Sequence, residues 1–133
     1  MTVSFVTDSE TATPQARPVD RAKLLIVDDD PEVRIIIAEF LQDFGYHVIQ
    51  ARGGSEALDM LARTPDLRML ITDIRMPDMS GIELANLATR RWCDLKVILM
   101  SGYFVAQHVE WRFLRKPFRM RDLEAAVRAE LDA

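Results

Sequence analysis

The hydrophobic residues of this chain form short unbroken runs, and four of these runs stop at a polar residue. Unbroken apolar runs are typical of parallel strands that are buried on both faces. If the runs are neighbouring strands, the polar residues at their carboxyl ends meet at one edge of a sheet. The runs and the residues that follow them are 24–27 with Asp28 and Asp29, 69–72 with Asp73, 97–100 with Ser101, and 113–115 with Lys116.

Between the runs, apolar residues recur at helical spacing. The first helical segment follows Asp30, which suits the N-cap position, and has Pro31 as its first helical residue. Gly45 ends the segment at a position that suits left-handed backbone. The apolar residues of this segment lie three and four apart and predict one stripe that faces the core. They are Val33, Ile36, Ile37, Phe40, Leu41 and Phe44.

The whole pattern alternates between strands and helices. Ser80 and Glu83 fit a capping box at the start of the third helix. The alternation favours right-handed crossovers and a parallel sheet with helices on both faces, which is the doubly wound α/β class. We expect residues 1–20 to be a disordered tail and residues 21–133 to form one domain, with no output domain after it. The expected strands are 23–27, 46–50, 69–72, 96–100 and 111–115, and the later helices are 55–63, 81–92 and 120–131.

The composition narrows the classes of function. The chain is 49% hydrophobic and 29% charged, as in an ordinary globular protein. A net charge of -4 without a basic stripe argues against direct binding of nucleic acid. No apolar stretch reaches transmembrane length, and the N-terminus does not resemble a signal peptide. Cys93 is the only cysteine, so we expect no disulfide framework and a cytoplasmic location.

The polar residues at the strand ends suggest chemistry on a phosphoryl group. Mg²⁺ prefers oxygen ligands and is usually held by one or two carboxylates together with phosphate oxygens. A carboxylate can also act as a nucleophile and form an aspartyl phosphate. Because Asp30 suffices as the helix cap, Asp28 and Asp29 are left without a structural task. Ser101 and Lys116 would supply a hydrogen bond and a positive charge to phosphoryl oxygens.

The chain resembles the receiver domain of two-component response regulators over residues 22–132. The motifs that carry the resemblance are Val27-Asp28-Asp29, then Asp73 with Met76-Pro77, Met79, Gly81 and Glu83, then Met100-Ser101-Gly102, and finally Lys116-Pro117-Phe118. Each motif alone is weak, but the four in this order are highly specific. The resemblance implies a flavodoxin-like sheet of five parallel strands in the order 2-1-3-4-5.

The resemblance also implies a role for each residue of the site. Asp73 matches the aspartate that accepts a phosphoryl group from the phosphohistidine of a histidine kinase or histidine phosphotransfer protein. Asp28 and Asp29 match the acid pair that positions Mg²⁺, which Asp73 and the backbone carbonyl of Arg75 would also ligate. The remaining matches are Ser101 and Lys116, which contact the phosphate, a cis peptide bond before Pro117, and Phe113 at the aromatic switch position.

Two features separate this sequence from the usual receiver. Ser101 and Lys116 are only 15 positions apart, so the fourth helix is expected to be shortened or irregular. Arg75 and Tyr103 occupy positions that tune phosphorylation and dephosphorylation rates in receivers, and the plainer interpretation is that both are solvated rim residues. Apolar residues around the short segment either plug the edge of the sheet or form a surface for a partner, such as a second copy of the chain. These residues are Tyr103, Phe104, Val105, Val109 and Trp111.

Two other classes of function stay open at this point. The first is a Mg²⁺-dependent phosphatase with an aspartyl nucleophile, but such enzymes need an acid two residues past the nucleophile, where this chain has Arg75. The second is a binding module that keeps the fold without phosphorylation, although the complete acid set, Ser101 and Lys116 argue against it. The sequence names neither the cognate kinase nor the downstream target.

Overall fold

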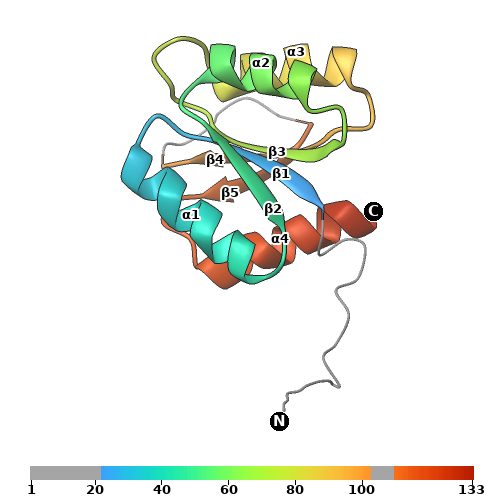
Figure 1. The fold of residues 1–133 in the computed structure, drawn as a ribbon. Coiled ribbons are helices and arrows are strands. Elements are labelled where there is room, and N and C mark those ends of the chain that lie inside the picture. The colour runs from blue at the N-terminus through green and yellow to red at the C-terminus, as the bar shows by residue number, and fades with distance from the viewer. Residues whose placement is uncertain (1–21, 103–109) are drawn as a thin grey trace.

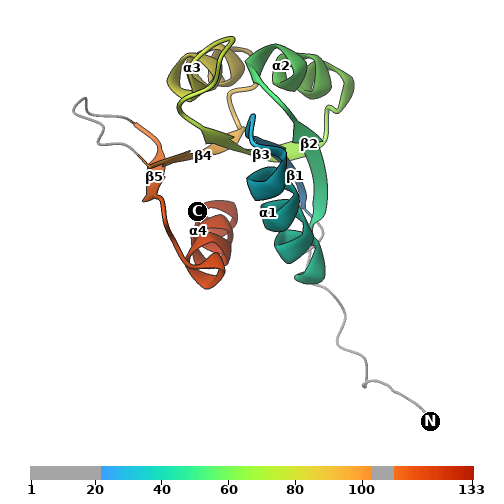
Figure 2. The ribbon, with the colours of Figure 1, turned by 90° about the vertical axis from the view of Figure 1, so that its left-hand side faces the viewer.

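The computed structural model describes residues 22–102 and 110–133, and within them five parallel strands form one sheet in the order β2-β1-β3-β4-β5. Helices α1 and α4 cover one face, and α2 and α3 cover the other (Figures 1 and 2). The predicted fold class and strand order are therefore confirmed. The elements are β1 (Lys23–Val27), α1 (Pro31–Asp43), β2 (His47–Ala51), α2 (Gly54–Arg63), β3 (Leu67–Asp73), α3 (Gly81–Arg91), β4 (Lys96–Ser101), β5 (Arg112–Arg115) and α4 (Met120–Asp132).

Two predictions fall outside the described residues. The disordered tail is predicted for residues 1–20, and the shortened fourth helix is predicted for the segment between Ser101 and Lys116, of which residues 103–109 are not described. Both stay predictions. None of the helices in the described parts of the chain is long and apolar enough to cross a membrane.

The register of the strands brings their carboxyl ends to one edge of the sheet. Val27 at the end of β1 pairs with Thr72, and Asp73 at the end of β3 pairs with Met100. Ser101, the last residue of β4, pairs with Arg115 at the end of β5. Because all pairings are parallel, the segments that follow β1, β3, β4 and β5 leave the sheet on the same side.

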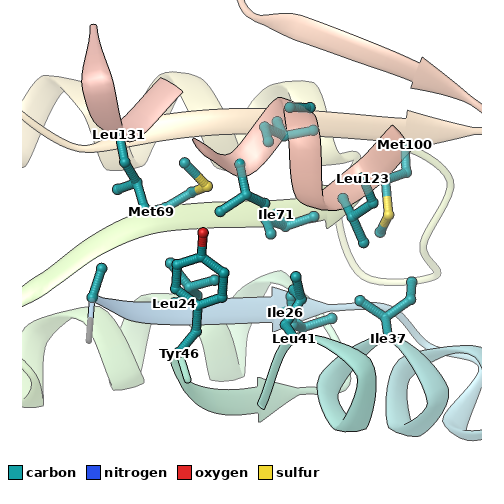
Figure 3. Packing of buried hydrophobic residues seen from close by; sticks show 14 residues of the cluster. Leu24, Ile26, Ile37, Leu41, Tyr46, Met69, Ile71, Met100, Leu123 and Leu131 are labelled. Carbon is teal, nitrogen blue, oxygen red and sulfur yellow. The ribbon is translucent and has the colours of Figure 1, made fainter. Parts of the chain in front are cut away.

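The sheet separates two hydrophobic clusters. Alternate residues of each central strand point to opposite faces, so Leu24 and Ile26 pack toward α1 and α4 while Leu25 and Val27 pack toward α2 and α3. Figure 3 shows the first cluster, in which Ile71 from β3 lies among side chains of β1, α1 and α4. This two-sided burial explains why the strands read as unbroken apolar runs.

The helix ends follow local rules that the sequence predicted. Asp30 is the N-cap of α1 and accepts a hydrogen bond from the Glu32 amide at 3.0 Å. Ser80 and Glu83 form a complete capping box at α3. Gly45, just past α1, has a φ of 100°, the left-handed backbone that glycine adopts without steric cost.

The predicted core stripe of α1 is too wide. Ile37 and Leu41 are buried, but Ile36 is 56% exposed and Phe44 is 45% exposed. A helix that packs on a sheet buries a limited arc, and Ile36 lies at the border of the predicted stripe, whereas Phe44 is the C-cap residue beyond the last residue of α1. The strand bounds also differ by one or two residues, and one difference matters: Asp73 and Ser101 are the last residues of their strands rather than the first residues of loops.

Candidate phosphoryl and metal site

The three predicted acids meet at the carboxyl edge of the sheet. Asp28 follows β1 directly, Asp29 is next to it, and Asp73 ends β3. One carboxylate oxygen from each lies within 4.8 Å of the others. Asp28 is buried, Asp73 is half-buried and Asp29 is exposed, so the cluster opens to solvent on the side of Asp29. An oxygen-only set with an open side fits Mg²⁺, which keeps several waters when it binds to proteins.

Lys116 lies beside this cluster and pairs with two of its members. Its Nζ is 3.0 Å from Oδ2 of Asp28 and 3.7 Å from Oδ2 of Asp73. The lysine follows β5, and its backbone N–H donates to the carbonyl of Ser101 at 2.8 Å. The Lys116–Pro117 peptide bond is cis, as the resemblance implied. The ammonium group therefore compensates part of the negative charge that the three acids bring together.

Burial of Asp73 affects its ionisation. Desolvation raises the pKa of this carboxyl above its ordinary value, and the nearby charge of Lys116 opposes the rise. Asp28 and Asp29 add to it by repulsion. Desolvation disfavours the ionised form of Asp73. A cation bound at the acid cluster would act in the opposite direction and favour the carboxylate.

The chain after Asp73 turns back sharply to begin α3. Ile74 donates its N–H to the Met100 carbonyl at 2.9 Å, and Gly81 donates to the Ile74 carbonyl at 2.8 Å. A Cβ atom at Gly81 would lie only 2.2 Å from the carbonyl oxygen of Asp73, so this position accepts no side chain. The first residue of α3 is thus packed directly against the backbone of Asp73.

The remaining predicted residues of the site differ in their burial and in the element that carries them. Ser101 is buried at the end of β4. Phe113 is half-buried on β5 and packs against the hydrophobic cluster on the α2 and α3 side of the sheet. Arg75 is exposed and lines a pocket of about 500 Å³ together with Asp29 and Ser80. Tyr103 lies outside the described residues.

One sequence argument about the acids is wrong. Asp28 was expected to have no structural task, but its Oδ1 accepts the Asp30 amide at 3.0 Å and so shapes the turn into α1. Sequence reasoning also missed Arg34, whose Nη1 donates to the backbone carbonyl of Asp28 at 2.9 Å. The only signal for Arg34 was its place on the first turn of a helix that starts at the site.

The doubly wound sheet, with an acid cluster and a lysine at the carboxyl ends of its strands, is the architecture of a phosphoacceptor signalling module. The chain belongs to the response regulator receiver domain family, whose model matches residues 24–128. Members of this family act in two-component signalling, in which histidine kinases phosphorylate them, and they bind Mg²⁺ at an acidic pocket. The predicted family is therefore confirmed.

Known proteins similar to the chain include a response regulator receiver protein, the receiver domain of a hybrid histidine kinase and a response regulator solved with Mg²⁺. The response regulator receiver protein CpdR of Brucella abortus is 37% identical over 108 residues, which cover 76% of this chain and 89% of CpdR. The receiver domain of the hybrid histidine kinase CckA superposes with a TM-score of 0.74 at 31% identity, covering 83% of this chain and 99% of that one. The response regulator TrrA of Thermotoga maritima, solved with Mg²⁺ and BeF, has a TM-score of 0.75 at 31% identity, covering 81% and 97%.

Proposed function

We propose that this protein is a cytoplasmic phosphorelay receiver that accepts a phosphoryl group on Asp73 from a phosphohistidine. The observation that carries the proposal is the meeting of Asp28, Asp29 and Asp73 within 4.8 Å, with Lys116 paired to two of them. Asp73 is the only one of the three acids that ends a strand, next to a sharply turned loop. Asp28 is engaged by Lys116 and by the turn into α1, which suits a positioning role.

The proposed transfer step uses the carboxylate of Asp73 as the nucleophile. An oxygen of Asp73 attacks the phosphorus, the bond between phosphorus and the imidazole nitrogen of the donor breaks, and that nitrogen leaves with the electron pair. The product is an acyl phosphate on Asp73 and a histidine on the donor. Lys116, at 3.7 Å from Asp73, is placed to stabilise negative charge on the phosphoryl oxygens.

Mg²⁺ fits the oxygen ligands of Asp28, Asp29 and Asp73, with the backbone carbonyl of Arg75 as a further proposed ligand. When bound, the ion supplies neutralisation of the charge that accumulates on the transferring group. The exposed side of the cluster at Asp29 leaves room for phosphate oxygens and water.

The proposed switch begins at Ser101 and Lys116 and ends at Phe113. Lys116 and Ser101 are tied through the backbone bond of 2.8 Å, so a phosphoryl group that attracts one of them pulls on the ends of both β4 and β5. Phe113 lies on β5 and is half-buried, which allows its ring to change position without leaving a fully packed core. A partner protein would then read the altered surface.

The phosphodonor would approach the carboxyl edge of the sheet, where the acid cluster lies. An apolar groove of about 470 Å³ adjoins Lys116 and lies between α1 and the start of α4, with Val33, Phe118 and Met120 among its lining residues. A histidine kinase or phosphotransfer protein that covered this groove would bring its phosphohistidine near Asp73. A second copy of this chain is one candidate for the downstream partner.

Arg75 and Tyr103 are proposed to tune the lifetime of the phosphorylated state. Arg75 lines the pocket that Asp29 borders, and its side chain is exposed there. In this proposal the charge of Arg75 and the bulk of Tyr103 restrict attacking water and slow the self-catalysed hydrolysis of the acyl phosphate. A lifetime of the acyl phosphate on Asp73 that is unchanged in both Arg75→Ala and Tyr103→Ala would refute this part of the proposal.

The function is tested by incubating the protein with Mg²⁺ and acetyl phosphate and measuring its intact mass. We expect a gain of one phosphoryl group that is absent without Mg²⁺ and absent in Asp73→Asn. Asp94→Asn is the matched control, because it removes an exposed loop carboxylate at the opposite edge of the sheet from the acid cluster. It should still be labelled.

Two results would overturn the proposal. Absence of labelling by acetyl phosphate and by a panel of phosphorylated histidine kinases would favour a binding module that only keeps the fold. Sustained turnover of p-nitrophenyl phosphate would instead indicate a phosphatase, which the exposed Arg75 at the second position after Asp73 does not favour.

A further inference from the structure

Arg34 connects three elements behind the acid cluster. It lies on the first turn of α1 and is half-buried. Its Nη1 donates to the backbone carbonyl of Asp28 at 2.9 Å, and its Nε donates to Oε1 of Gln50 near the end of β2 at 3.0 Å. One guanidinium group therefore joins α1, the residue after β1 and the neighbouring strand β2.

The carbonyl that Arg34 holds belongs to the peptide unit between Asp28 and Asp29. The N–H of Asp28 donates to the Ala51 carbonyl on β2 at 3.2 Å, so the main chain of Asp28 is bonded on both sides. The rotation of the peptide after Asp28 decides where the Asp29 side chain points. A bond to its carbonyl thus fixes the relative direction of the two carboxylates.

The geometry of arginine suits this task. Its donors form a rigid planar fork, so Gln50 and the Asp28 carbonyl together set the orientation of the whole group. A lysine could reach one acceptor but not hold both at defined angles. The side chain of Arg34 contacts a carbonyl rather than a carboxylate, so its contact acts on the direction of the acids through the backbone.

We propose that Arg34 is a positioning residue that preorganises Asp28 and Asp29 for Mg²⁺ binding, with Gln50 orienting its guanidinium group. This inference rests on the proposed function, because it concerns the same acid cluster. Replacing a residue that holds a metal ligand in place commonly lowers metal affinity 10–100-fold.

Charge and positioning predict opposite signs for the same substitution. Arg34→Met removes a positive charge close to the acids, so Coulomb interaction alone predicts tighter binding of Mg²⁺. Loss of positioning predicts weaker binding. We expect a rise of about 10-fold or more in the Mg²⁺ dissociation constant, measured by isothermal titration calorimetry on the complete chain.

The matched control is Arg52→Met. Arg52 follows β2 at the same edge of the sheet, but its side chain is exposed and pairs with Glu56 on α2 at 3.6 Å. We expect Mg²⁺ affinity in this variant to be unchanged or slightly higher. A loss equal to that of Arg34→Met would overturn the inference, because it would show that the loss of affinity does not depend on the contact between Arg34 and the Asp28 carbonyl.

A second pair of variants keeps the test decisive if Arg34→Met unfolds, which circular dichroism would report. Arg34→Lys should recover part of the affinity, and Gln50→Ala should weaken binding severalfold while all charges remain. In phosphorylation by acetyl phosphate, the half-saturating Mg²⁺ concentration should rise in each variant, while the rate at saturating Mg²⁺ should approach that of the wild type.

The outcomes separate this inference from the proposed function. If the wild type binds Mg²⁺ and is labelled on Asp73 but the Arg34 and Gln50 variants bind Mg²⁺ equally well, only the positioning role is refuted. If the wild type itself binds no Mg²⁺ and takes no phosphoryl group, the proposed function and the positioning role both fail.

Discussion

Asp78 caps a helix that is 24 residues away in the sequence, and its replacement should loosen the phosphoacceptor loop. Helix α2 has Gly53 at its N-cap, and this residue has no side chain to accept a bond. Asp78 takes over this role: its Oδ1 accepts the Gly54 amide at 3.2 Å, and its Oδ2 accepts the Ser55 amide at 2.9 Å. The loop that follows Asp73 is thereby fastened to α2.

The magnitude follows from helix capping. Replacing a side chain that caps a helix by alanine costs about 1 kcal/mol. A carboxylate at an exposed helix N-terminus adds roughly 0.5 kcal/mol through the helix dipole. We therefore expect Asp78→Ala to lower the free energy of unfolding by about 1.5 kcal/mol. For a domain of this size each kcal/mol lowers the melting temperature by roughly 4 °C.

Urea unfolding measures this change as a lower midpoint with an unaltered slope. Asp78→Asn keeps one acceptor oxygen but replaces the other by an amide NH₂, which cannot accept from a backbone N–H, and it also loses the charge, so its loss should be about 1 kcal/mol. Asp94→Ala, which changes an exposed loop acid at the other edge of the sheet, should stay within about 0.5 kcal/mol of the wild type.

A double variant tests the mechanism. A Cβ at Gly53 would lie 2.8 Å from Oδ1 of Asp78, and the φ of Gly53, -168°, suits any residue. Gly53→Ser should therefore destabilise the wild type, yet stabilise Asp78→Ala by supplying a local cap. If the two substitutions were additive, or if Asp78→Ala left the midpoint unchanged, the capping role would be refuted.

The pH dependence of this effect has a defined sign. Hydrogen bonds from the backbone, led by that of Ser55, lower the pKa of Asp78 below its ordinary value of 3.8. A group whose pKa is lowered in the folded state stabilises the fold above its unfolded pKa. The difference between wild type and Asp78→Ala should thus be largest at neutral pH and decrease as the pH falls through the lowered pKa, because the protonated carboxyl loses its charge but keeps one acceptor oxygen.

Three further predictions concern other parts of the domain. Because burial raises the pKa of Asp73, its carboxylate form destabilises the fold, and Asp73→Asn should melt at a higher temperature than the wild type at neutral pH without Mg²⁺. The difference in melting temperature should vanish in acid, where Asp73 is protonated in both the folded and the unfolded wild type. Calorimetry over a pH series with a chelator measures this difference. Ser80→Ala removes one half of the α3 capping box and should cost about 1 kcal/mol in urea unfolding. Val33→Glu places a charge in the groove beside Lys116 and should slow phosphotransfer from a cognate kinase about 10-fold, or 1.4 kcal/mol. Labelling by acetyl phosphate should stay near the wild-type rate. An equal loss of rate with both donors would count against docking of the kinase at this groove.

Much of the fold could be predicted because its signals are local. Strands buried on both faces leave unbroken apolar runs, and caps such as Asp30 and the Ser80 box follow from two or three adjacent residues. The order of the strands is different, since apolar runs do not state which strands are neighbours. That order came from the resemblance to receivers and is confirmed by the pairing of β1 with both β2 and β3.

The acids of the site could also be found from the sequence, whereas the residues that hold them could not. Asp28, Asp29 and Asp73 stand at strand ends, which a sequence displays directly. The bond from Arg34 to Asp28 and the cap that Asp78 gives to α2 join segments whose distance in space no local pattern encodes. The exposure of Ile36 has a related cause, because helical periodicity gives the direction of a buried face but not its width.

These long-range bonds indicate how phosphorylation would act on the resting arrangement. Lys116 is now closer to Asp28, at 3.0 Å, than to Asp73, at 3.7 Å. A phosphoryl group on Asp73 adds negative charge and new acceptor oxygens there, so the ammonium group should move toward it. Asp28 keeps its bond from the Asp30 amide, and its backbone keeps those to Arg34 and Ala51, so β1 and β2 should hold still. The displacement then passes to the side of the sheet where the backbone of Lys116 is bonded to Ser101, and we expect β4 and β5 to carry the change.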